Sequence, residues 1–517
     1  MNLRDKEEGE PTTKREQALR PRLAERVLVL VLLMPVVIAF GFRVLLVFNM
    51  SFDPDEYQYL HHAWMVMNGF LPYRDFFHNH TPGLWYLLAP LAWLFDERSA
   101  YLFACRIVMV VLTLAIFFMV YRLTATSSSY VRPIFSIFLL NIELWFVWKT
   151  LEVRPDQVVI LSWLFGVWVL VRSRGPIPSR TYGVSGLSVG MGLLFSPKAL
   201  FAIAALGGAL LLLRPIGRLR APAWRDIGLF GLMSLTPIAC LLLLMWSRDE
   251  GWPFLLVQQA FLFNVRYPSR FSGLRYFNAS LNGTPLFWML ALTACVLVVR
   301  RIQRCAAEQE RRALVMLASS TLAAGLAYFV FLPVAYSQSL LPFITFLAIL
   351  GAECGGWLDG RIARTHQDFK SRGLVACLAG LLAVLSFHSL TSIANALHPL
   401  SRTNREQVER ITSILRVTTR SDAILDGYAM YVMRPQASFY GVMFLGLRVA
   451  LKSGSMRYDI PERCVVNGCP VIILDTRLLE VAPWMGEFVR ANYAPSSVER
   501  VYLRRGIGNR DRGAPDQ

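Results

Sequence analysis

Acidic and imidazole side chains concentrate in one polar stretch of the sequence, 52-FDPDEYQYLHHAWMVMNGFLPYRDFFHNHTPGLWY-86. It directly follows a long apolar run, contains four of the seven histidines and opens with the carboxylates Asp53, Asp55 and Glu56. A carboxylate that acts as a general base accepts a proton from a substrate hydroxyl or amine. Each residue taken singly has the simpler interpretation of a solvated charge beside a membrane span, but the clustering points to chemistry.

A second polar segment, 149-KTLEVRPDQVVIL-161, brings further charges together. Asp156 stands at the start of an apolar run, with Glu152 and Arg154 just before it. Because carboxylates favour helix N-termini, Asp156 is either a first-turn acid or part of a site, and both interpretations stay open. Glu143 falls near the end of the preceding apolar run, where a polar group usually faces a bundle interior or a cavity.

Cations that are able to bind a phosphate occur in two later loops. Lys198 lies in 195-FSPKAL-200, and Arg266, Arg270 and Arg275 lie in 264-NVRYPSRFSGLRYF-277. Ammonium and guanidinium groups bind phosphate through charge-assisted hydrogen bonds. Together with the carboxylates they suit an anionic, lipid-linked substrate whose tail lies in the membrane. For the arginines, contact with ordinary anionic headgroups is an equally open interpretation.

Apolar helices must position these groups. Of the 517 residues 55% are hydrophobic and only 17% are charged, below the usual quarter for soluble domains. The sequence predicts an all-α polytopic membrane bundle of about eleven spans. The expected spans are 27–49, 99–121, 131–148, 157–172, 183–196, 198–213, 226–246, 284–300, 313–333, 338–357 and 373–397. The short spans 183–196 and 198–213 are expected to form a buried hairpin, and Gly186 and Gly190 predict close helix packing.

The distribution of basic residues predicts the orientation of the chain. Lys and Arg gather around Arg122 and in 172–174, 214–220, 300–312 and 361–372, which all fall on one side of an eleven-span bundle. Positive loops favour the cytoplasm, so residues 1–26 are expected to be a disordered cytoplasmic tail without a cleavable signal peptide. The first loop, 50–98, and the tail, 398–517, are then periplasmic, in a bacterial inner membrane. The net charge of +18 is explained in this way, and nucleic-acid binding is not expected.

The tail, 398–517, is too polar for a membrane. The helical pattern 404-NREQVERITSILRVTTR-420 is followed by strand-like runs such as 471-VIILD-475, which predicts a small α/β domain. Cys464 and Cys469 favour a disulfide over a metal site, because two cysteines alone make a weak metal site. Within the first loop, 63–71 and 81–95 are expected to be amphipathic helices at the membrane interface.

The segment 67-MNGFLPYRDFFHNHTPGLWYLLAPL-91 and the acids before it resemble the GT-C class of polytopic glycosyltransferases. Protein O-mannosyltransferases, lipid A aminoarabinose transferases and core galacturonosyltransferases belong to this class. The resemblance extends to 152-EVRPDQVV-159, 195-FSPKAL-200 and 336-YSQSLLPF-343. It implies a polyprenyl-phosphate-sugar donor, no nucleotide, and inverting transfer of a hexose or pentose. By the same resemblance Asp55 is the base, Glu56 completes the acidic motif and Asp156 is the second acid.

The loop charges and the resemblance together predict a set of substrate-binding residues. These are His78, His80, Arg154, Lys198, Arg266, Arg270 and Tyr336. Thr81 departs from the pattern, because many members have a lysine there, and Lys198 or an arginine of the same side is expected to replace it. His80 stands where some members have a metal-binding glutamate, so a divalent metal at His80 is a hypothesis, although no cofactor is required.

Several alternatives remain open at this stage. A lipid or glycan transporter predicts acids spread through mid-membrane spans and an inverted repeat, and a non-catalytic assembly protein predicts tolerance to loss of Asp55. Mannose, arabinose, aminoarabinose and galacturonic acid donors all suit the sequence. The acceptor is equally open between lipid A, core oligosaccharide, another envelope glycan and a protein.

Overall fold

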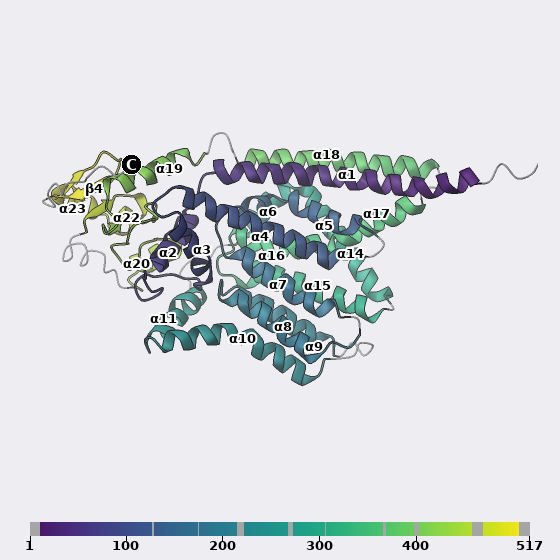
Figure 1. Cartoon of the computed structure of the whole chain (residues 1–517), viewed down its shortest axis with the longest axis horizontal. Helices are drawn as coiled ribbons and strands as arrows, with labels where there is room; N and C mark the ends of the chain where they lie inside the picture. The colour runs from purple at the N-terminus through teal and green to yellow at the C-terminus, as the bar shows by residue number, and fades with distance from the viewer. Residues whose placement is uncertain are drawn as a thin grey trace, which may run out of the picture.

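The computed structural model describes residues 11–126, 129–173, 175–214, 222–266, 272–305, 307–364, 369–397, 403–456 and 469–505. Long helices run side by side through most of the molecule, and a small α/β domain lies at one end of them (Figure 1). The bundle consists of α1 (Pro11–Asn49), α4 (Ala100–Thr124), α5 (Val131–Asn141), α6 (Leu144–Lys149), α7 (Asp156–Val171), α8 (Ser179–Leu193), α9 (Ala199–Leu212), α10 (Trp224–Trp246), α14 (Pro285–Arg304), α15 (Glu308–Leu326), α16 (Leu341–Leu350), α17 (Ala352–Arg364) and α18 (Phe369–Leu397).

The predicted helical membrane bundle is confirmed. Seven helices of the described residues are long and apolar enough to cross a membrane. The expected spans 131–148, 157–172, 183–196 and 198–213 correspond to shorter helices. Span 131–148 is divided because the buried Glu143 caps α6, accepting a hydrogen bond from the Phe146 amide at 2.6 Å.

Close packing between α8 and α10 follows from two small residues, as predicted. A Cβ atom at Gly186 would lie 2.2 Å from the carbonyl oxygen of Phe230, and one at Gly190 would lie 2.3 Å from that of Ser234. Only glycine permits this approach of the two backbones. The packing fixes the hairpin of α8 and α9 against the rest of the bundle.

Basic segments meet at one end of the bundle, which we call the basic end. Arg312 of α15 donates to the carbonyl oxygens of Ser173 and Gly175, which follow α7. Arg132 of α5 and Arg301 of α14 both pair with Glu353 of α17. Segments far apart in the sequence but expected on one side of the membrane therefore do lie together.

The opposite end, which we call the loop end, carries the first loop and the tail domain (Figure 1). The first loop forms α2 (Pro54–Met67) and α3 (Gly83–Leu94), and short helices surround the same end: α11 (Trp252–Leu256), the π-helix η1 (Val257–Leu262), α12 (Phe263–Val265), α13 (Leu274–Gly283), the π-helix η2 (Ala327–Phe331) and the 3-10 helix η3 (Ser337–Leu340). The expected interfacial helix 63–71 is wrong in its bounds. It begins earlier, because Asp53 and Pro54 start α2, and it is largely buried beneath the tail domain.

The tail forms the predicted α/β domain. Its elements are α19 (Arg405–Val417), β1 (Ile424–Leu425), α20 (Leu445–Lys452), β2 (Val471–Ile473), α22 (Thr476–Val481), α23 (Met485–Asn492), β3 (Tyr493–Pro495) and β4 (Val501–Arg504). The strand order is β1-β2-β4-β3; β1 and β2 are parallel, with Ile424 opposite Val471, and the other pairs are antiparallel. Cys469 is disulfide-bonded, and its expected partner, Cys464, lies outside the described residues.

Candidate functional site

The acidic motif at the head of the first loop is first of all a helix start. Asp53 caps α2: its side chain accepts a hydrogen bond from the Asp55 amide at 3.0 Å, and the Glu56 side chain accepts one from the Asp53 amide at 2.9 Å. Pro54 occupies the first helical position, where its missing N–H costs nothing. Because the side chains of Asp53 and Glu56 make this reciprocal cap, the side chain of Asp55 takes no part in capping the helix.

Glu56 is completely buried and fully occupied. Its two oxygens accept hydrogen bonds from Nε and Nη2 of Arg106 at 2.9 and 2.7 Å, and also from the amides of Asp53 and Val153. Arg106, on α4, is equally buried. The predicted catalytic role of Glu56 therefore gains no support, and its contacts make it a positioning residue that ties α2 to α4 and to the loop before α7.

Arg154 joins three carboxylates at the centre of the site. Its guanidinium lies 2.8 Å from Asp55, 2.9 Å from Asp53 and 2.5 Å from Glu152. Lys149 lies 2.5 Å from Glu152 and 4.0 Å from Asp53. These two cations compensate the acids, so ionised carboxylates are able to crowd together at the loop end.

Asp55 combines charge with access. About a third of its side chain, 36%, is exposed, whereas Glu152 is 1% exposed. The low-dielectric surroundings act to raise the pKa of Asp55, but the charge and hydrogen bond of Arg154 outweigh them and hold the pKa below its ordinary value. Asp55 is therefore ionised and reachable, as a proton acceptor must be.

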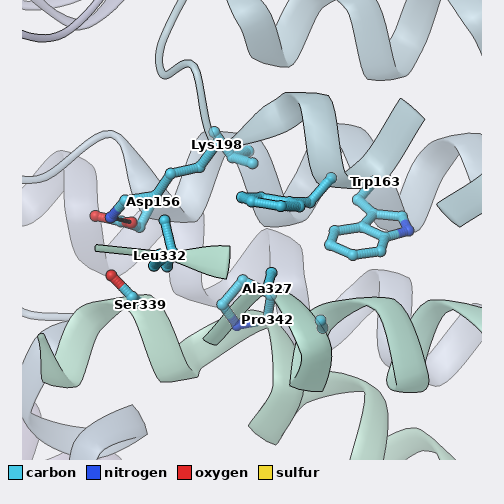
Figure 2. Close-up of a pocket in the computed structure, with 10 residues that line it drawn as sticks. Asp156, Trp163, Lys198, Ala327, Leu332, Ser339 and Pro342 are labelled. Carbon is cyan, nitrogen blue, oxygen red and sulfur yellow. Dashed lines mark hydrogen bonds and ion pairs between the residues drawn. The ribbon is translucent and has the colours of Figure 1, made fainter. Parts of the chain in front are cut away.

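Asp156 and Lys198 form the polar end of an adjacent pocket. Lys198 Nζ lies 2.8 Å from Asp156 Oδ1. Figure 2 shows this pair beside Ser339, with Trp163 at the far end of the pocket. The remaining lining is apolar and includes Val159, Phe201, Ala324, Ala327, Leu332 and Pro342. A cation at the mouth of an apolar pocket suits a phosphate attached to a hydrocarbon chain.

Two of the predicted substrate-binding residues are histidines with different surroundings. His78 is fully buried, and its Nδ1 accepts a hydrogen bond from the His80 amide at 2.9 Å, so the structure does not place it at an accessible surface. His80 is partly exposed. Burial and then the charge of Lys198 lower the pKa of His80 to about 3. The negative charge of Asp156 opposes this shift, and the positive charge of Arg154 adds to it. His80 thus borders the site as a neutral imidazole.

Three further predicted residues differ in how they relate to Asp55. Burial and then the charge of Asp55 raise the pKa of Tyr336, whose ring lies 6.4 Å from that of Tyr276 between centroids. Arg266 is exposed at the end of α12, and no contact within the described ranges joins it to the acids. Arg270 lies outside the described residues.

The metal hypothesis at His80 gains no support from the geometry. Across the part of the chain that the structure describes, no group of three or more His, Cys, Asp or Glu side chains is placed to hold a metal ion. Ring contacts occupy His62, which stacks on Phe76 at 4.3 Å between centroids, and His61 Nδ1 lies 2.8 Å from the carbonyl oxygen of Val432. We therefore derive no chemical step through a metal.

Sequence reasoning missed Arg106 and Lys149 as partners of the acids. Arg106 lies 50 residues after Glu56 in the chain, inside an apolar span. A charged residue within a span is itself a signal, since such groups usually pair inside the bundle. Lys149 lies three residues before Glu152, and only this closeness along the sequence could have identified it as a partner of the acids.

The fold is similar to that of the GT-C class of membrane glycosyltransferases. The family of dolichyl-phosphate-mannose-protein mannosyltransferases matches residues 79–246, from the end of the first loop through α10. No curated protein matches the chain by sequence. The remaining similarity is therefore one of structure.

Two solved structures share the fold. ArnT of Cupriavidus metallidurans, bound to undecaprenyl phosphate, has a TM-score of 0.61 at 12% identity; the match covers 88% of this chain and 94% of that one. The oligosaccharyltransferase AglB of Archaeoglobus fulgidus, in complex with an inhibitory peptide and a dolichol-phosphate, has a TM-score of 0.57 at 11% identity, covering 86% and 69%. These matches confirm the predicted GT-C resemblance at the level of the fold.

Proposed function

We propose that the chain transfers a sugar from a polyprenyl-phosphate donor to an acceptor of the bacterial cell envelope, with Asp55 as the base. The observation that carries this proposal is the state of Asp55, which is ionised, a third exposed and free of capping duty beside a cation-headed apolar pocket. Glu56 and Glu152 are buried in ion pairs, and Asp53 caps α2. Asp55 is thus the best-placed acid of the described cluster.

The reaction requires a base and cations. Asp55 takes the proton of the acceptor hydroxyl or amine, whose oxygen or nitrogen forms a bond to the anomeric carbon. The bond from this carbon to the phosphate oxygen breaks, and its electron pair leaves with the polyprenyl phosphate. A single displacement of this kind inverts the anomeric centre. The leaving phosphate gains negative charge, which fixed cations stabilise in the transition state.

Lys198 is the residue that we assign to the donor phosphate. It lies at the polar end of the small apolar pocket that residues of α7, α9 and α15 line. Asp156 then acts as a positioning residue, because it holds Lys198 at 2.8 Å. Lys198 takes over the role of the lysine that many members of the GT-C class have at the position of Thr81. His80 and Tyr336 are proposed to border the same phosphate site.

The proposed location is the bacterial inner membrane, with the N-terminus in the cytoplasm and the loop end in the periplasm. The gathering of basic segments at the opposite end supports this orientation. It also accounts for the net charge of +18 without nucleic acid. The acceptor is an envelope glycan, a lipid such as lipid A, or a protein, and the sugar is a hexose or a pentose.

Mass spectrometry of envelope lipids and glycans tests the proposal. The strains are the wild type, a deletion, and the deletion carrying wild-type protein, Asp55→Asn or Asp53→Asn. We expect one glycan to lose a fixed sugar mass in the deletion and in the Asp55→Asn strain. Asp53→Asn is the matched control, since Asp53 also pairs with Arg154, is 31% exposed, and asparagine caps helices as well as aspartate does.

The outcomes separate the candidate functions. Loss of the sugar with Asp55→Asn and its retention with Asp53→Asn support transfer with Asp55 as the base. Equal loss in both variants would assign the effect to the charge cluster rather than to a base. A normal glycan in the Asp55→Asn strain, with a defect only in the deletion, would refute the mechanism and favour a lipid or glycan transporter.

A further inference from the structure

Another cavity lies at the basic end of the bundle, opposite the acids of the loop end. Its volume is about 350 Å³, which is within the range of small-molecule sites. The end of α4, the end of α7 and the start of α15 form its walls, and the charged residues among them are Arg122, Arg172 and Glu310. The cavity is therefore large enough for a ligand, and its charges decide which kind of ligand it takes.

Both arginines stack on one aromatic ring of the cavity wall. Arg122 stands in the last turn of α4, and Arg172 directly follows the last residue of α7. Their guanidinium carbons lie 5.7 and 4.6 Å from the ring centroid of Trp168. Within the described ranges, neither guanidinium group has an ion pair or a side-chain hydrogen bond. Two sets of N–H donors are thus held at one place and are free to bind a ligand.

The acid of the cavity wall is paired elsewhere. Glu310 forms an ion pair with Arg301 of α14, which also pairs with Glu353. The charges of Arg122 and Arg172 therefore remain uncompensated at the cavity. Two cations beside one ring repel each other, and an anion bound between them replaces this repulsion with attraction.

Two contacts fix the end of α7 against the start of α15. Gln309 donates a hydrogen bond to the carbonyl oxygen of Val171 at 3.4 Å. The buried Arg312 donates one to the carbonyl oxygen of Ser173 at 2.5 Å. Since these contacts flank Arg172 on both sides along the chain, the backbone that carries this arginine is held in place before a ligand binds.

The face of α4 that leads to the cavity is apolar and exposed. Four large side chains follow one another on it at helical spacing, each between 45% and 60% exposed: Ile107, Val111, Leu114 and Phe118. Arg122 comes next on this face, four residues after Phe118. The stripe extends about 16 Å along the helix axis, which is close to the thickness of one leaflet's hydrocarbon layer. An acyl chain that follows the stripe brings its headgroup to Arg122.

We propose that the cavity at the basic end binds a phosphate group between Arg122 and Arg172. Guanidinium groups bind phosphate through charge-assisted hydrogen bonds, often in a bidentate manner. Two sources supply such a group: the headgroup of an anionic phospholipid, which the apolar face of α4 favours, and a soluble phosphate. The inference does not depend on the proposed function, because the donor pocket lies nearer the other ends of α7 and α15.

The experiment uses the full-length protein in detergent. Native mass spectrometry measures the binding of phosphatidylglycerol, with phosphatidylcholine as the zwitterionic control lipid. Thermal unfolding with inorganic phosphate at constant ionic strength tests the soluble source. We expect Arg122→Gln and Arg172→Gln each to lower phosphatidylglycerol affinity about fivefold, and the double variant about 25-fold, at the usual contribution of a basic residue to anionic-lipid binding.

Three further variants separate a defined site from general attraction. Ala313→Phe fills part of the cavity without a change of charge, and it should also lower the affinity. Arg225→Gln is the matched control, since it changes an exposed arginine that follows the basic segment 214–220 and does not line the cavity. Lys198→Ala changes the donor pocket instead. We expect these last two variants to bind phosphatidylglycerol like the wild type.

The outcomes identify the ligand or overturn the site. Weaker phosphatidylglycerol binding in the cavity variants alone would assign the site to an anionic lipid. Stabilisation by inorganic phosphate that Arg122→Gln and Arg172→Gln abolish, with unchanged lipid affinity, would assign it to a soluble phosphate. An equal fall in Arg225→Gln would mean diffuse attraction to the basic end, and a fall in Lys198→Ala alone would mean binding in the donor pocket. Either result, or a double variant that matches the wild type in both assays, would overturn the inference.

Discussion

The buried ion pair of Glu56 and Arg106 should decide the stability of the loop end. In Glu56→Gln, the guanidinium of Arg106 keeps the backbone carbonyl oxygens of Val47, Met50 and Ser51, but it retains at most one of its two side-chain acceptors. The two oxygens of Glu56 accept hydrogen bonds from four N–H groups. The side-chain amide of the glutamine has only one oxygen, and its nitrogen accepts no hydrogen bond, so the N–H groups bound to the other oxygen lose their acceptor. Both side chains are 0% exposed, so solvent does not screen the loss. Removing one partner of such a pair costs about 3–5 kcal/mol.

Thermal unfolding of the purified protein measures this cost. Glu56→Gln should unfold at a clearly lower temperature, and the double variant Glu56→Gln/Arg106→Met should recover part of the loss because no isolated charge remains buried. Glu409→Gln is the matched control, since its pair with Arg405 lies 2.8 Å apart but is exposed. This control should unfold like the wild type.

The same variants separate structure from catalysis. If Glu56→Gln unfolds at the wild-type temperature but forms no product, Glu56 is catalytic and the structural assignment made here is refuted. If it is destabilised and retains product in proportion to the folded fraction, the positioning role stands.

Three further predictions concern the site and the bundle. Arg154→Met removes the main charge that holds the pKa of Asp55 down, so the pKa of Asp55 should rise. Because only ionised Asp55 accepts a proton, the acid limb of the pH–rate profile should then move to higher pH. An acid limb that does not move would contradict the pairing of Arg154 with Asp55. Lys198→Ala should weaken undecaprenyl phosphate binding by about 10- to 100-fold in native mass spectrometry, and unchanged affinity would remove Lys198 from the phosphate site. Gly190→Ala places a Cβ atom 2.3 Å from the backbone of α10 and should lower the free energy of unfolding by about 1–3 kcal/mol. Gly231→Ala, which meets nothing within 4 Å, should cost no stability, and equal thermal shifts for the two would argue against the packing.

Much of the fold was accessible from sequence because its determinants are local. Each span is a continuous apolar run, and a bilayer forces such a run into a helix. Span 131–148 shows the limit of this approach. Hydropathy predicted one span where Glu143 caps a second helix, α6, and Ser280, more than a hundred residues away in the chain, also donates a hydrogen bond to this buried carboxylate.

Some of the residues predicted for the site contact one another in the structure, and their roles stay predictions. Asp55, Asp156, Lys198 and Arg154 do lie together at the loop end. His78, by contrast, is buried among aromatic rings, with Trp85 at 4.6 Å between centroids. Residue type marks a histidine as reactive, but only packing determines whether a substrate reaches it.

The sequence by itself determined the membrane bundle and the end at which its basic residues gather. The start of α2 at Asp53 and Pro54 also depends on neighbours along the chain, although the expected helix 63–71 missed it. Only the tertiary structure decided that Glu56 is buried in an ion pair with Arg106 while Asp55 stays accessible. The physical reason is that the free energy of a charge depends on burial and on the distance to its partners in space. Arg106 becomes the partner of Glu56, and Arg154 the partner of Asp55, only when the chain folds.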